Sequence, residues 1–83
     1  MYMKIKINDN HFSKNIKRLR LASGLTQEQT VAKMNVIGSP ISRSTYSWIE
    51  MGRGNIFISD FVALQKILKA DFSQFFEGVG PEK

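Results

Sequence analysis

The sequence predicts an all-α fold, in which five short helices form one compact domain behind a short extended arm. Apolar residues recur at helical spacing in five separate stretches, and each stretch is bounded by a capping residue, a glycine or a proline. Only residues 3–7 alternate with the period of two that is typical of a strand. We therefore expect an arm at 1–9, a helical core at 10–77 and a loose tail at 78–83, together making a single domain.

The first helix is expected to follow the good capping residues at 8–10 and to run to about Ser23. Gly24 is a natural C-terminal stop for it, because glycine adopts the left-handed conformation that often ends a helix. The inward-facing residues of this helix are Phe12, Ile16 and Leu19.

A second helix is expected to open at Thr26, which forms a capping box with Gln29, and to end near Gly38. Pro40 prevents its continuation, because the proline ring pushes the preceding residue into an extended conformation. Ser42 then caps a third helix that runs through residue 51. The inward residues of this pair are Val31, Met34, Ile41, Tyr46 and Ile49.

The C-terminal third predicts two more helices after a turn at 52–55. Ser59 is expected to cap the fourth, and Asp71 with Gln74 forms a second capping box that opens a short fifth helix. The apolar residues assigned to the core here are Phe61, Leu64, Ile67, Leu68, Phe72, Phe75 and Phe76.

Charge is distributed unevenly along the 83 residues, whose formal net charge is +5. Residues 1–53 carry a balance of +6 and residues 54–83 a balance of −1. This asymmetry fits a protein with one face that meets phosphates, although a solubilising surface charge would give the same composition. No apolar run approaches a membrane span or a secretion signal, so we expect a cytoplasmic protein without membrane contact.

The residues that enzymes and metal sites need are scarce. The chain has no cysteine, its one histidine is His11, and its glycines stand singly rather than in a phosphate-cradling loop. We therefore expect no enzymatic activity, no cofactor and no metal site.

The third helix has the features of a helix that enters the major groove of DNA. Its outward positions are Arg43, Ser44, Ser47 and Trp48. A helix fits the groove, which is about 12 Å wide, and arginine can bond a guanine with two donors while serine can donate or accept.

Three segments give the sequence a resemblance to a known family. They are 25–29 (LTQEQ), 41–52 (ISRSTYSWIEMG) and 71–76 (DFSQFF), with Arg20 ahead of them. In this order they resemble the phage-repressor-like (Cro/CI, XRE-type) helix-turn-helix family over about residues 12–77. The longer connection at 35–40 is similar to a longer-turn branch of that family.

The resemblance implies a transcriptional regulator that binds double-stranded DNA, and we expect it to be a repressor. We also expect a homodimer, because one helix contacts too few base pairs to select a site among about 10⁶ competitors. It implies a phosphate contact for Gln27, base contacts for Arg43 and Ser44, and an architectural pair formed by Arg20 and Glu50. The full set expected at the DNA is Gln27, Ser42, Arg43, Ser44, Thr45, Ser47, Trp48, Arg53 and Asn55.

Several assignments stay open at this point. Arg43 could contact a base, contact a phosphate or be solvated, and Trp48 could stack on DNA, bind a protein or cover the extended turn, which we favour. Phe76 is a candidate for a dimer interface, and the arm could touch DNA or a dimer partner, or be disordered. The alternative function is a protein-interaction module, such as an antitoxin or a partner of an anti-repressor, that uses Trp48, Tyr46 and Phe76.

Overall fold

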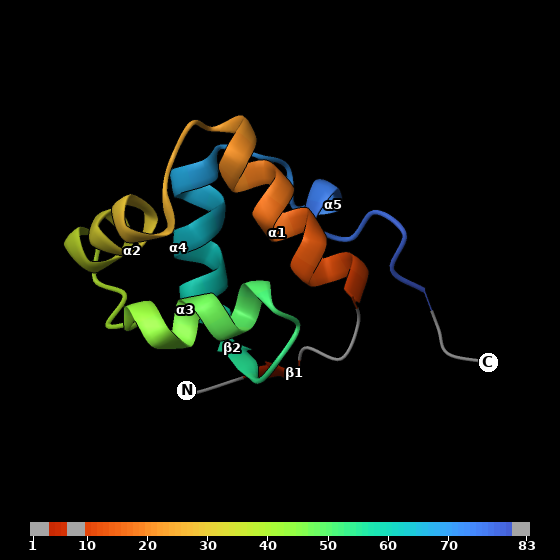
Figure 1. Ribbon diagram of the computed structural model, residues 1–83, viewed down its shortest axis with the longest axis horizontal. Coiled ribbons are helices and arrows are strands. Elements are labelled where there is room, and N and C mark those ends of the chain that lie inside the picture. Colours follow the sequence, from red (N-terminus) through yellow and green to blue (C-terminus); the bar gives the residue numbers. More distant parts are fainter. Residues whose placement is uncertain (1–3, 7–9, 81–83) are drawn as a thin grey trace.

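The computed structural model describes residues 4–6 and 10–80, and it is mostly helical, as predicted (Figure 1). The helices are α1 (Asn10–Ala22), α2 (Gln27–Val36), α3 (Arg43–Glu50), α4 (Ile58–Leu68) and α5 (Phe72–Phe75). Two short strands, β1 (Lys4–Lys6) and β2 (Asn55–Phe57), form an antiparallel pair in which residue 5 faces residue 56.

The helices cross one another around α4. Figure 1 shows α4 in the middle of the molecule, α1 and α2 on either side of it, and α3 running across the lower end. The packed pairs include α2 with α3 and α4, and α1 with α3 and α5. This arrangement leaves one long side of α3 uncovered.

The predicted apolar stripes form one core. Ile16, Met34, Tyr46 and Leu64, one from each of the first four helices, are completely buried, whereas Ile67 is only partly buried against the cluster. The buried apolar residues are Phe12, Ile16, Leu19, Val31, Met34, Ile41, Tyr46, Ile49, Ile56, Phe61, Ala63, Leu64, Leu68, Ala70 and Phe75.

Two helix starts that orient α2 and α3 follow the predicted caps. The backbone N–H of Gln29 donates to Thr26 Oγ1 at 3.0 Å, and the backbone N–H of Thr26 donates to Gln29 Oε1 at 3.0 Å. At the start of α3, Ser42 Oγ accepts from the backbone N–H of Thr45 at 3.1 Å. Each cap supplies a partner for an N–H group that the helix itself leaves unpaired.

α2 runs to Val36 with Ile37 as its C-cap, so it ends near Gly38 as expected. Gly38 adopts a φ of +106°, which ends the helix. Asn35 Nδ2 then donates to the carbonyls of Ser39 and Ile41 at 2.8 and 3.1 Å. The extended turn is therefore held in one shape, which fixes the approach of the chain to α3.

The region before α4 corrects two expectations. The turn at 52–55 does not lead to a cap at Ser59, because Asn55 already belongs to β2 and α4 begins at Ile58. Pairing of β2 with the arm keeps the backbone extended through Phe57, which becomes the N-cap without a side-chain bond. Ile56 of this strand joins the core, although the sequence alone suggested a turn ending just before it.

The phenylalanines of α5 divide into two kinds. Phe75 is fully buried, with its ring 5.1 Å from that of Phe61, whereas Phe72 and Phe76 are exposed at the edge of the core. The rings of Phe76 and Phe12 stack at 5.3 Å. The expected caps at residues 8 and 9 lie outside the described residues, as do residues 81–83 of the expected tail.

Candidate nucleic-acid interface

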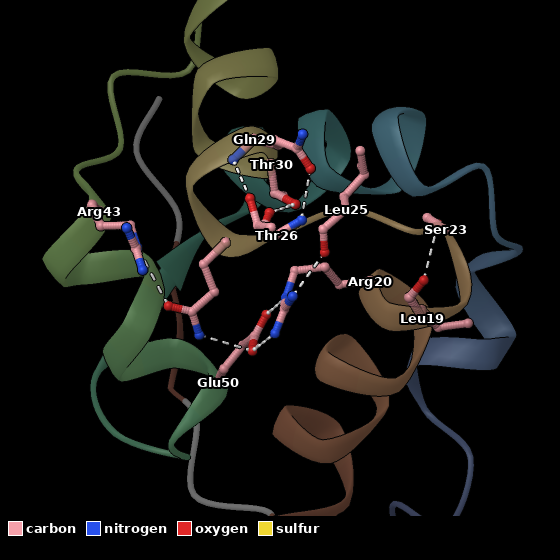
Figure 2. Close-up of polar contacts among 10 residues, drawn as sticks. Leu19, Arg20, Ser23, Leu25, Thr26, Gln29, Thr30, Arg43 and Glu50 are labelled. Carbon is pink, nitrogen blue, oxygen red and sulfur yellow. Dashed lines mark hydrogen bonds and ion pairs between the residues drawn. The ribbon is translucent and has the colours of Figure 1, made fainter.

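A buried ion pair joins α1 to the end of α3. Arg20 Nε donates to Glu50 Oε2 at 2.7 Å, and Arg20 Nη2 donates to Glu50 Oε1 at 3.0 Å (Figure 2). The two side chains are only 8% and 2% exposed. Arg20 Nη1 also donates to the carbonyl of Leu25 at 2.8 Å, so the same guanidinium ties the loop before α2 to the pair.

The surroundings of the pair favour its charged form. Burial by itself raises the pKa of Glu50, but the hydrogen bonds from Arg20 and Gln27 and the positive charge of Arg20 outweigh it and lower that pKa below 4.5. The hydrogen bond to Glu50 raises the pKa of Arg20. Burial also raises the pKa of Tyr46, whose hydroxyl is enclosed beside the pair and stays neutral.

Gln27, at the start of α2, links this pair to the exposed side of α3. Its Nε2 donates to Glu50 Oε1 at 3.1 Å, and its Oε1 accepts from Arg43 Nε at 3.5 Å. Figure 2 shows Arg43 on α3 at one end of this chain of contacts and Arg20 on α1 at the other. A bond of 3.5 Å is long, so it orients the arginine weakly rather than fixing it.

The uncovered side of α3 gathers most of the predicted residues into one shallow hollow of about 310 Å³. It is lined by Gln27, Arg43, Ser44, Ser47, Trp48 and Met51. Within the described residues, only Nε of the Arg43 guanidinium has a hydrogen-bond partner. The two terminal nitrogens of Arg43 are therefore available, and they are the donors that contact a guanine bidentately.

Four predicted residues lie apart from this hollow. Ser42, Thr45 and Asn55 line a second hollow on another side of α3, of about 240 Å³. Ser42 Oγ also donates to Thr45 Oγ1 at 3.0 Å, so both hydroxyls take part in the cap at the start of α3. Arg53 is exposed in the turn after α3, which is tied back by a bond from its backbone N–H to the carbonyl of Trp48 at 2.9 Å.

Trp48 is 59% exposed and lines the hollow on α3. No residue of the connection at 35–40 lines that hollow, so the hollow does not support the expectation that Trp48 covers the extended turn. Tyr46, named for the alternative function, is completely buried and cannot contribute to a protein-binding surface.

The structure adds two residues to the candidate site. Met51 is exposed beside Trp48. It lies one helical turn after Ser47, and this spacing could have identified Met51 from the sequence as part of the same face. Lys17 is exposed on α1, on the same side of the helix as Ser13 and Arg20. Ser13 lies beside Gly52, and Arg20 is bonded to Glu50 at the end of α3. Lys17 thus flanks the end of α3.

Within residues 4–6 and 10–80, no three His, Asp or Glu side chains are grouped so that they could hold a metal ion. Among the helices described there, none combines the length and the apolar character that crossing a membrane would require.

The comparison with known protein families agrees with this geometry. A family model described as a helix-turn-helix domain matches residues 11–73, which is more than half of the chain. The protein belongs to this family of DNA-binding domains. No curated protein and no solved structure matches the chain significantly.

Proposed function

We propose that the protein binds double-stranded DNA at specific sequences and acts as a transcriptional regulator, with α3 in the major groove. The observation that carries this proposal is the uncovered face of α3, where the two terminal nitrogens of Arg43 have no hydrogen-bond partner among the described residues and lie beside Ser44 and Ser47. An α-helix with its side chains is about 10–12 Å in diameter, which matches the width of the groove, and the eight residues of α3 give it about 12 Å of length to lie along the groove.

The network behind α3 supports this proposal by giving the helix a fixed position. The Arg20–Glu50 pair joins α3 to α1, and Gln27 joins the same carboxylate to Arg43. In a complex, the amide of Gln27 and the free N–H groups at the start of α2 would meet a phosphate next to the bases that Arg43 contacts. Arg53 and Lys17 would add phosphate contacts on the other side of α3.

The proposal is tested by selecting bound sequences from random DNA duplexes at low and at high salt. We expect a defined motif to be enriched, and the affinity of the selected duplex to fall with a log–log salt slope of about −0.9 for each phosphate contacted. Enrichment of no motif, or affinity for DNA that salt does not change, would contradict sequence-specific DNA binding.

We further propose that the active species is a homodimer and a repressor of the longer-turn branch of the phage-repressor-like family, working in the cytoplasm. One α3 contacts too few base pairs to single out a site among about 10⁶ competitors, whereas two related helices double the contacts. Phe72, Phe76 and Val79 supply exposed apolar surface for pairing, and Phe75 does not, because it is buried.

The dimer is tested by light scattering and by footprinting on the selected duplex. Two half-sites about 34 Å apart, and a mass of two chains, are expected. Val79→Glu should weaken the dimer without disturbing the core, whereas Phe76→Glu also removes the ring contact with Phe12. A monomer that binds a single half-site with full affinity would contradict the dimer.

The alternative function, a module that binds a protein through the α3 face, finds some support in the exposed Trp48 and Met51. Apolar contacts respond little to salt, so the same salt series separates the two functions.

A further inference from the structure

A second surface, away from α3, has the features of a protein-docking groove. It lies between the C-terminal ends of α2 and α4 and has a volume of about 660 Å³. We call it the α2–α4 groove. It is lined by Ser23, Leu25, Lys33, Val36, Ile37, Lys66, Ile67, Leu68 and Lys69, and none of these residues lines the hollow on α3.

Two adjacent apolar residues that line the groove are strongly exposed. Val36 is 86% exposed and Ile37 is 52% exposed, although both are large apolar side chains on adjacent positions. Together with the partly buried Leu25 and Ile67 they give the groove an apolar lining beside polar side chains, which is the character of a ligand or peptide site.

The groove is elongated. Beyond Ile37 and Ile67 it continues into a hollow of about 350 Å³ along α4, which also includes Ser59 and Val62. From Ser59 to Lys69 the axis of α4 rises by about 15 Å, which is nearly three helical turns. An elongated apolar channel of that length suits a helix better than a compact small molecule.

The charges at the rim select the partner. Lys33, Lys66 and Lys69 line the groove, and neither this groove nor its continuation along α4 has an acidic lining residue among the described residues. A second copy of the chain would bring six lysines together, which like-charge repulsion opposes. DNA phosphates would meet the lysines but leave the apolar side chains between them unused, so an occupant with both acidic and apolar groups fits the groove better.

We infer that the α2–α4 groove docks an amphipathic helix of a partner protein, whose apolar stripe is flanked by Asp or Glu side chains. The stripe lies on Val36, Ile37 and Ile67, and the acidic side chains meet the lysines at the rim. Since the groove and the α3 face share no residue, a partner there leaves the DNA-contacting side chains uncovered. The inference therefore does not depend on the proposed function.

The test uses two fluorescein-labelled helical peptides of about 14 residues, long enough for three to four turns. Both carry the same stripe of leucines at helical spacing, flanked in one peptide by glutamates and in the other by lysines. Fluorescence anisotropy with the full chain should show that the glutamate peptide binds at least about tenfold more tightly than the lysine peptide. Lys66→Glu combined with Lys69→Glu should reverse this preference.

A matched pair of variants locates the binding. Ile37→Ser should reduce affinity for the glutamate peptide at least about fivefold, because it removes apolar contact at a site already exposed to solvent. Leu21→Ser should leave that affinity unchanged, since Leu21 is 58% exposed but lies outside the groove. Circular dichroism verifies that both variants are folded.

Three results would overturn the inference. They are equal affinity for the two peptides, no binding of either, and binding that Arg43→Ala removes while Ile37→Ser does not. The last result would place the peptide on the α3 face instead.

Discussion

The buried Arg20–Glu50 pair offers a sharp test of how α3 is held. Replacing Arg20 by methionine leaves the Glu50 carboxylate 2% exposed, with Gln27 as its remaining side-chain donor. Replacing Glu50 by leucine leaves the Arg20 guanidinium with the carbonyl of Leu25 as its remaining hydrogen-bond partner among the described residues. Each change strands a charge in the interior, which costs roughly 3–5 kcal/mol.

Removing both members of the pair should cost far less than the sum of the two single losses. The double variant, Arg20→Met with Glu50→Leu, leaves no buried charge and fills the space with apolar groups of similar size. We expect a coupling energy of about 2 kcal/mol or more between the two positions. A domain of this size loses about 4–8 °C in Tm for each kcal/mol, so the single variants should melt more than about 10 °C lower.

The chain contains its own control for this experiment. Arg18 and Glu77 form an ion pair at 3.4 Å, with side chains that are 49% and 61% exposed. Breaking that pair should cost no more than about 1 kcal/mol, because water and salt screen it. Urea unfolding followed by circular dichroism measures all the variants. Additive losses at residues 20 and 50, or losses as small as those at residues 18 and 77, would refute the account of α3 positioning.

Three further predictions concern pH, the turn and α1. The pKa of Glu50 in the folded protein lies below 4.5, so its contribution to stability should be fully present above about pH 4.5 and should be lost as the pH falls through that lower pKa. Urea midpoints measured from pH 7 to pH 3 test this, and Glu50→Gln should remove this part of the acid sensitivity. Asn35→Ala removes the two hydrogen bonds that shape the turn before α3, so it should cost about 1–2 kcal/mol of unfolding free energy and weaken binding of the folded protein to the selected duplex. An unchanged unfolding free energy together with unchanged DNA affinity would contradict that role of Asn35. Lys17→Ala should reduce the salt slope of DNA binding by about one phosphate contact, whereas an unchanged slope would place Lys17 away from the DNA.

Local signals made the helices predictable from the sequence. The capping box at Thr26 and Gln29 and the cap at Ser42 depend on residues three apart, and the structure contains both. The same holds for the apolar stripes, because helical spacing alone decides which side chains share a face. The Arg20–Glu50 pair, by contrast, was expected only from a family resemblance, because no local pattern joins two residues thirty positions apart, and its geometry comes from the structure.

Pairings between distant segments could not be predicted. Ile56 is buried because β2 pairs with β1, some 50 residues earlier in the chain, and no local pattern reports such a contact. The surroundings of Trp48 stayed open for a related reason: they depend on how α2 and α3 cross, which sequence spacing does not specify. The α2–α4 groove likewise exists only once two separate helices have packed.

The central claim is that α3 contacts bases through Arg43, and affinities of variant proteins for single-base variants of the selected duplex test it most directly. Arg43→Ala should lose about 1–3 kcal/mol at one base position and become indifferent to the base there. Arg53→Ala, the matched control outside the α3 hollow, should weaken binding to every duplex by the same factor. If Arg43→Ala also weakens all duplexes equally and keeps the wild-type base preference at every position, then Arg43 contacts the phosphate backbone and the account of α3 is wrong.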